Sequence, residues 1–264
     1  MKAISFELSG KTACFRKPDV NQYAYFTYNN IHKPALLGLL GAILGLGGHI
    51  QLHNENRKIE DENKTIKKKA DKKPLNDGYP EFYEKLKELK VSITPLTPHG
   101  YFSKKIQVFN NSVGYASREA GGNLIVREQW LENPKWQIMI LDDKTDEYIK
   151  LKEYLTKNKA VYIPYLGKND HPATIRKVRE IVLSNELFLS DGNYIDSLFI
   201  KNSDKIDGWQ KEEESPYLFQ EVSPIKLQKE YHFYEYETLV FTNLEVKTIP
   251  CDTFAYKNKN YVFI

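Results

Sequence analysis

The chain has 264 residues, enough for one large domain or two small ones with a substantial core. Its 41% hydrophobic and 28% charged residues are ordinary for a folded protein, and a net charge of +3 is too mild to indicate a nucleic-acid binder by itself. The cysteines, Cys14 and Cys251, form no CxxC pair, and no histidine cluster has metal-ligand spacing. These observations argue against a disulfide framework or a zinc site and favour a reducing, cytoplasmic location.

The first segment, Lys2–Leu8, alternates apolar and polar residues and predicts a half-buried strand. It lacks the long apolar core of a signal peptide. The most apolar run, Pro34–Gly48, has no charged residue but is shorter than the roughly 18–20 residues needed to span a bilayer. We therefore expect a soluble, intracellular protein with no membrane partner.

A long aromatic loop leads into a predicted helix within Asn30–Gly48, where Pro34 fits the first turn. Because each glycine inside a helix costs roughly 0.5–1 kcal/mol relative to alanine, glycines on one side predict that another backbone approaches closely. The simpler interpretation is that this glycine-containing side of the helix packs on a sheet. A second, compatible interpretation places the helix start, with His32 and Lys33, against a phosphate chain. At about 100° per residue, the residues on the small side are Ala35, Gly38, Gly41, Ala42 and Gly45.

The segment Asn54–Asn76 is polar and includes a basic run, Arg57–Lys73, with eight basic and four acidic residues. Such a run is usually a solvated, mobile insertion. The alternative is a flexible arm that touches a nucleic-acid backbone.

Helices and strands follow in an order that indicates an α+β fold. The order is strand, helix, long hairpin, helix and strand, which is the split βαβ or ferredoxin-like pattern. A glycine-rich stretch, Ser112–Asn123, is the tip of the hairpin. We divide the chain into a ferredoxin-like domain, residues 1–172, and a smaller β-rich C-terminal region, residues 173–264. The predicted helices are Glu81–Lys90 and Asp146–Asn158, and the strands lie within Val91–Asn111 and at Asn123–Leu131, Lys135–Leu141 and Val161–Leu166.

Basic and aromatic residues gather before the first helix, on the hairpin, and in the turn after Val161–Leu166. Together they suit single-stranded RNA, because splayed bases stack on aromatic faces while lysine and arginine neutralise phosphates. For any single residue a solvated side chain is the plainer interpretation, so only the whole set predicts binding. The candidate RNA-binding residues are Arg16, Lys17, Tyr25, Tyr28, His32, Lys33, Lys104, Lys105, Arg118, Arg127, Lys168, Asn169 and His171.

Four segments, in this order, resemble the Cas-five family, the CRISPR-associated RAMP-superfamily subunits of type I Cascade complexes. They are FELSGKTACFRKP, TYNNIHKPALLGLLGAILGL, NLIVREQWLENPKWQIMI and YIPYLGKNDHPATI. The resemblance covers about Ile4–Ile175 and is nearest to the type I-B branch, with PYLGKNDHPA as its most telling piece.

This resemblance implies a ferredoxin-like (RRM-related) domain with a protruding β-hairpin thumb, about residues 104–129, whose tip lies near residues 115–122. It also implies a role in antiviral defence. Such a protein binds the 5′ handle of the CRISPR RNA (crRNA), caps one end of the effector complex, and contacts its backbone and large subunits. Target DNA is a further candidate partner.

One branch of the family cleaves precursor crRNA without a metal, using a tyrosine near the first helix and a Lys-His pair. Here Tyr25 or Tyr28, with His32 and Lys33, offer similar groups, but the hairpin carries no Lys-His pair. We therefore expect a non-catalytic RNA binder without cofactor or metal, in which His32 caps the helix or contacts a phosphate or sugar. A metal-independent endoribonuclease is the alternative, and a protein-interaction scaffold without RNA is a third hypothesis.

Overall fold

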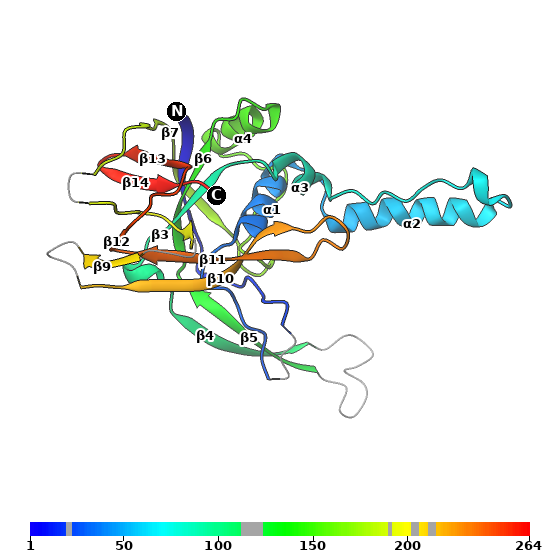
Figure 1. Cartoon of the computed structure of the whole chain (residues 1–264). Coiled ribbons are helices and arrows are strands. Elements are labelled where there is room, and N and C mark those ends of the chain that lie inside the picture. The colour runs from blue at the N-terminus through cyan, green and yellow to red at the C-terminus, as the bar shows by residue number, and fades with distance from the viewer. Residues whose placement is uncertain (20–22, 112–123, 190–191, 202–205, 211–214) are drawn as a thin grey trace.

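The computed structural model of the chain describes residues 1–19, 23–111, 124–189, 192–201, 206–210 and 215–264. Its helices are α1 (Lys33–Leu44), α2 (His49–Thr65), α3 (Glu81–Leu86) and α4 (Asp146–Thr156), with 3-10 turns at Lys69–Asp71 and Pro98–Gly100 (Figure 1). Its strands are β1 (Lys2–Ser9), β2 (Thr12–Ala13), β3 (Val91–Pro95), β4 (Lys104–Asn111), β5 (Leu124–Glu132), β6 (Lys135–Leu141), β7 (Thr174–Val182), β8 (Phe199–Ile200), β9 (Ile206–Gln210), β10 (Leu218–Leu227), β11 (Tyr234–Thr242), β12 (Leu244–Val246), β13 (Thr253–Tyr256) and β14 (Lys259–Val262).

The centre of the fold is a four-stranded antiparallel sheet with the order β3–β6–β1–β7. Helix α1 follows the first of these strands along the chain, and α4 follows the third. Alternate residues of β1, such as Ile4 and Phe6, share one core with buried residues of α1 and α4. The other face of the sheet contributes Ala3 and Met139 to a second core, which residues near the C-terminus complete. The sheet is therefore covered on both faces.

The C-terminal region packs on the same core as the N-terminal part. Ile225 and Leu227 of β10 and Phe241 of β11 are buried in the cluster that contains α1. Strand β7 completes the central sheet by pairing with β1, with Ile175 opposite Leu8. The sequence-based division between residues 172 and 173 is wrong for this strand, since it separates β7 from the sheet to which it belongs.

The strand predicted at Val161–Leu166 is also wrong. The backbone N–H groups of Val161 and Tyr162 donate hydrogen bonds to the carbonyls of Ile43 (3.0 Å) and Ala42 (3.1 Å). These carbonyls belong to the last turn of α1, where carbonyls lack the usual helical partner four residues on. The carbonyl of Ala42 also accepts the N–H of Gly45 (3.3 Å). The apolar segment therefore caps a helix instead of joining the sheet, and β7 takes the place of the last core strand.

The basic run predicted as a mobile insertion forms the second half of α2 and the start of the segment that returns beside it. Figure 1 shows α2 extending away from the sheets, and no residue of this helix is buried. The sequence gives little sign of this helix, because it has no apolar face to bury. No single helix of the described residues is long and apolar enough to cross a membrane. Helices α1 and α2 taken together have the length and composition of a membrane span, but a 74° bend separates them.

The small-residue side of α1 faces α3, and the close neighbour is a side chain rather than a backbone. A Cβ atom built on Gly41 would lie 2.6 Å from Cβ of Phe82, whereas on Gly38 the nearest Phe82 atom would be 3.8 Å away. The helix ends at Gly45, whose φ of 79° is the left-handed conformation typical of a glycine after a helix. Of the two glycines inside the helix on this side, Gly38 and Gly41, close packing therefore requires only Gly41.

We expect Gly41→Ala to destabilise the protein and Gly38→Ala to stabilise it. Crowding Phe82 costs typically 1–3 kcal/mol, more than the roughly 0.5–1 kcal/mol gained by replacing a glycine inside a helix. At Gly38 only the gain applies, because its added methyl group meets Phe82 at an ordinary contact distance. Urea unfolding of the two variants measures the difference, and an equal stabilisation by both would contradict the assigned packing.

Candidate nucleic-acid interface

Two parts of the chain meet beside the base of the β4–β5 hairpin, which leads away from the central sheet (Figure 1). The loop after β2 runs back along β5: the N–H of Tyr25 donates to the carbonyl of Arg127 (2.9 Å), and the N–H of Gln129 donates to the carbonyl of Tyr25 (2.8 Å). Arg16 forms an isolated bridge with Thr27 in the same loop. Residues expected at one binding face from separate parts of the sequence are therefore adjacent here.

Two arginines of this surface lie over tyrosine rings. The guanidinium carbon of Arg16 is 3.3 Å from the ring centroid of Tyr25, and that of Arg127 is 5.2 Å from the ring centroid of Tyr23. Tyr23 is 67% exposed and Arg16 is also exposed. Such cation–π pairs hold flat, charged groups at the surface, where an unstacked base can stack on them.

The turn that includes Lys168 joins the same place through an ion pair. The Nζ of Lys168 lies 2.8 and 2.9 Å from the two carboxylate oxygens of Glu128. One of them, Oε2, also accepts the indole N–H of Trp130 (3.0 Å). Burial disfavours the charged amine, yet the hydrogen bond and charge of Glu128 raise the pKa of Lys168 overall. Since the Glu128 side chain is only 5% exposed, this lysine mainly compensates a buried charge and holds the turn against β5.

His171 anchors the other end of this turn. It is completely buried, its Nδ1 lies 2.7 Å from the hydroxyl of Thr12, and the Trp130 ring meets it edge-on at 4.6 Å. Burial lowers the pKa of His171, so the ring is neutral at pH 7. Its Nε2 is buried without a hydrogen-bond partner. Asn169, between the two anchors, is exposed.

Tyr28, His32 and Lys33 are buried and do not reach this surface. His32 caps α1, with its Nδ1 accepting the N–H of Ala35 (3.2 Å), and burial lowers its pKa to about 3. The rings of Tyr28 and Tyr234 enclose it edge-on at 5.3 Å. Of the two roles expected for His32, the geometry is that of a cap.

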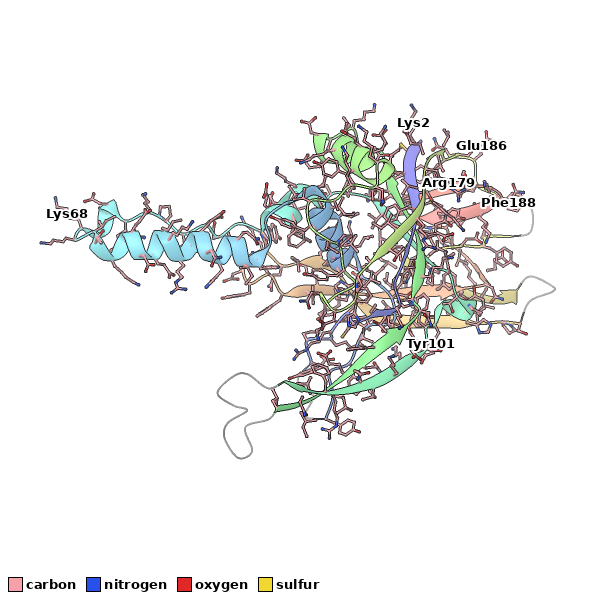
Figure 2. The ribbon with its side chains drawn as sticks, turned by 180° about the vertical axis from the view of Figure 1, so that it is seen from behind. Lys2, Lys68, Tyr101, Arg179, Glu186 and Phe188 are labelled. Atoms are coloured by element: carbon pink, nitrogen blue, oxygen red, sulfur yellow. The ribbon has the colours of Figure 1, made fainter. Side chains whose placement is uncertain are left out.

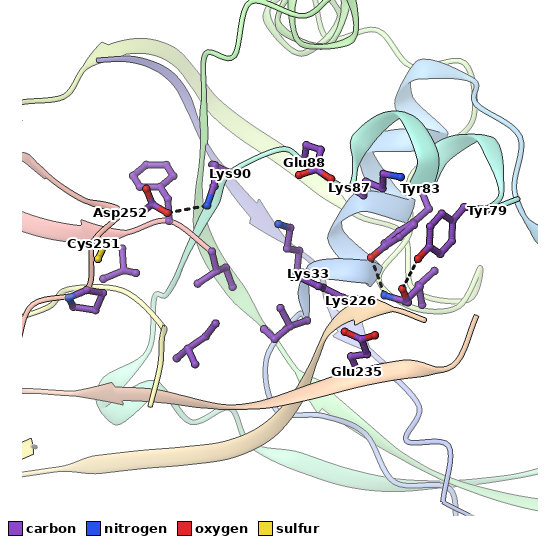
Figure 3. A pocket seen from close by; sticks show the side chains of 17 residues that line it. Lys33, Tyr79, Tyr83, Lys87, Glu88, Lys90, Lys226, Glu235, Cys251 and Asp252 are labelled. Atoms are coloured by element: carbon purple, nitrogen blue, oxygen red, sulfur yellow. Dashed lines mark hydrogen bonds and ion pairs between the residues drawn. The ribbon is translucent and has the colours of Figure 1, made fainter. Parts of the chain in front are cut away.

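Lys33 lines a cavity of about 610 Å³ between α1, α3 and the C-terminal strands (Figure 3). Only 6% of the residue is exposed, and burial, together with the charge of Lys90, lowers its pKa to about 8. Lys90 itself pairs with Asp252 at 2.8 Å, while Tyr83 receives the N–H of Leu227 at 2.7 Å. The cavity is separate from the surface beside the hairpin.

The remaining predicted lysines lie near carboxylates. Lys17 is 3.9 Å from Glu221 and Lys105 is 3.7 Å from Glu132. Burial lowers the pKa of Lys104, whose charge is near Glu221. Arg118 and the expected hairpin tip fall in residues 112–123, outside the described residues.

Sequence reasoning missed Glu128, Glu221 and Tyr23. Burial raises the pKa of Glu221, whose two carboxylate oxygens accept the N–H of Asn29 at 3.0 and 2.9 Å. Glu221 lies on β10, about two hundred residues from this loop, so no local pattern signals the contact. Tyr23 was visible in the aromatic loop, but its pairing with Arg127 depends on the fold.

No protein-family model and no curated protein matches the chain. The solved structures that it resembles include CRISPR-associated proteins. A chain of a CRISPR RNA-guided surveillance complex aligns with a TM-score of 0.49 at 13% identity, covering 93% of this chain and 91% of that chain. A CRISPR protein from Archaeoglobus fulgidus gives 0.43 at 8% identity, covering 99% and 98%. A chain of the type III-B Cmr-beta complex, bound to cognate target RNA and AMPPnP, gives 0.41 at 12% identity, covering 93% and 84%.

Proposed function

We propose that this chain is a non-catalytic subunit of a type I-B-like CRISPR effector complex and that it binds and caps the 5′ handle of the crRNA. The subunit works in the cytoplasm, contacts the backbone and large subunits of the complex, and contributes to antiviral defence. Its domain is ferredoxin-like, and the β4–β5 hairpin is its thumb.

The order of elements supports the fold part of this proposal. Helices α1 and α4 follow the first and third strands of a sheet ordered β3–β6–β1–β7. A ferredoxin-like core has this alternation of strands and helices, with a crossover at each helix. The four sequence segments that resemble the Cas-five family provide the family assignment.

The observation that carries the functional part is the pair of arginine–tyrosine stacks at the hairpin base. Arg16 lies over Tyr25 within the loop after β2, and Arg127 of β5 lies over Tyr23 of the same loop. Guanidinium groups neutralise phosphates, and the rings beside them offer faces for single-stranded bases. We propose that these four residues, with the exposed Asn169, contact the handle, while Glu128, Lys168 and His171 position the turn.

The test is nuclease protection of the handle in the assembled complex. When the chain is expressed with the backbone subunit and guide RNA, we expect the 5′ handle to be protected. The double variant Arg16→Gln/Arg127→Gln is expected to bind handle RNA at least tenfold more weakly, since a lost base stack costs about 1–3 kcal/mol.

Lys2→Gln/Lys247→Gln is the matched control, because both lysines are exposed and the loss of charge is the same. A handle that is digested equally with and without the chain, or an equal loss of affinity in the control, would contradict the proposal. Incubation of the purified protein with repeat RNA in EDTA distinguishes a binder from a metal-independent endoribonuclease, because only the endoribonuclease would cleave the RNA.

A further inference from the structure

Residues His49–Gly78, which we call the arm, consist of α2 and the segment that returns beside it. The arm extends from the body with Lys68 at its far end (Figure 2). No residue of α2 is buried, so the arm adds nothing to the hydrophobic core. A polar helix of this length is marginal in water unless other contacts hold it.

Two asparagines hold the arm in a defined shape. Asn56 donates to the carbonyl of Asn76 (2.9 Å) and accepts its N–H (2.8 Å). Asn63 makes the same pair of bonds with the backbone of Lys73, both at 2.8 Å. The two asparagines are seven residues apart, which places them on one side of the helix. The arm is thus a helix fastened along its length to an extended segment.

The far end of the arm has an excess of positive charge, since Asp71 is the one acidic residue among the lysines from Lys67 to Lys73. Lys64 and Lys73 pair with Asp61 (2.7 Å) and Glu62 (2.8 Å). The other lysines with described side chains beyond α2 are exposed and have no ion pair with any described residue; they are Lys67, Lys68 and Lys72. Anions must therefore be attracted to this end of the arm.

The arm contains no Phe, Tyr or Trp. Proteins that bind single strands place bases on aromatic faces, as we propose for the hairpin base. Lysines neutralise phosphates as point charges and give no face on which a base can stack, and a double helix presents phosphates while its bases stay stacked inside. We propose that the tip of the arm binds the phosphate backbone of a nucleic-acid duplex without sequence preference. This contact is independent of the proposed function at the hairpin base.

The test is the salt dependence of duplex binding by the full chain, measured by fluorescence anisotropy. The probes are a DNA duplex, an RNA duplex and a DNA single strand of about 20 nucleotides per strand, and each phosphate contact contributes about 0.9 to the slope of log K against log salt on B-DNA. We expect Lys67→Gln/Lys68→Gln/Lys72→Gln to reduce the slope on duplex DNA by about 2–3 and the affinity at low salt more than tenfold. A matching loss on the RNA duplex would extend the contact to both kinds of duplex; a loss on DNA alone would assign it to DNA.

The matched control is Lys2→Gln/Lys247→Gln/Lys257→Gln, which removes three charges from exposed lysines of the body. An unchanged slope in the arm variant, or an equal loss in the control, would overturn the proposal. A greater loss on the single strand than on either duplex would overturn it too. So would an arm variant that loses only its binding to phosphatidylserine vesicles, because the arm would then recognise an anionic lipid surface.

Discussion

Lys168→Met is expected to lower the free energy of unfolding by about 3 kcal/mol, because it leaves the Glu128 carboxylate buried without its cation. Both carboxylate oxygens lie within 2.9 Å of the lysine amine, and the Glu128 side chain is only 5% exposed. Removing one partner of such a pair costs about 3–5 kcal/mol. The indole N–H of Trp130 still donates to the carboxylate, which favours the lower end of that range. At this chain length, the loss corresponds to a fall of Tm of about 6–12 °C.

Two further variants separate the buried charge from general effects of losing a lysine. Lys105→Met breaks a 3.7 Å pair in which both side chains are 41% exposed, so its effect is expected to stay within about 1 kcal/mol. Adding Glu128→Gln to Lys168→Met removes the unpaired charge and is expected to recover most of the loss. Calorimetric scans of the three variants give the comparison, and a double variant no more stable than Lys168→Met would mean that packing, rather than charge, governs this turn.

The sequence predicts the elements with periodic patterns and misses those whose residues serve distant partners. Strands β5 and β6 and helix α4 lie where alternation and helical spacing place them. Val161–Leu166 has the composition of a strand, yet Ile163 is 81% exposed. A short apolar run shows only that the residues are apolar; here their backbone caps a helix that ends more than a hundred residues earlier.

The residues of the candidate site also divide into those that local sequence patterns indicate and those that distant contacts determine. Arg16 and Tyr25 could be selected from the sequence because cations and aromatic residues alternate before the first helix. Their neighbours Tyr28 and His32 belong to the same run, but Tyr234 and other residues of the C-terminal strands cover them. Whether a residue of this loop faces solvent or the core is decided by β10 and β11, about two hundred residues later. Only long-range contacts could have separated the two groups.

Gly167→Ala is expected to lower the free energy of unfolding by about 2–5 kcal/mol and to weaken RNA binding at the hairpin base. A Cβ atom here would lie 2.0 Å from the carbonyl oxygen of Cys14, a backbone atom that cannot rotate away. The φ of 87° adds the roughly 1–2 kcal/mol that a left-handed conformation costs an L side chain, and the overlap adds about 1–3 kcal/mol. The N–H of Cys14 donates to the carbonyl of Leu166 (3.1 Å), so the strained turn must shift away from this contact and carry Lys168 with it.

Gly192→Ala isolates the conformational part of this effect. Gly192 also has a positive φ, 117°, but an added Cβ would meet only side chains, the Glu245 carboxylate at 3.0 Å and the Tyr194 ring at 3.1 Å, which can shift by a few tenths of an ångström. We therefore expect a loss of only about 1–2 kcal/mol there and unchanged RNA affinity. Urea unfolding and anisotropy with handle RNA, run on both variants, test the pair. Equal losses of stability would show that φ alone requires glycine at position 167, and unchanged RNA binding by Gly167→Ala would remove this turn from the proposed interface.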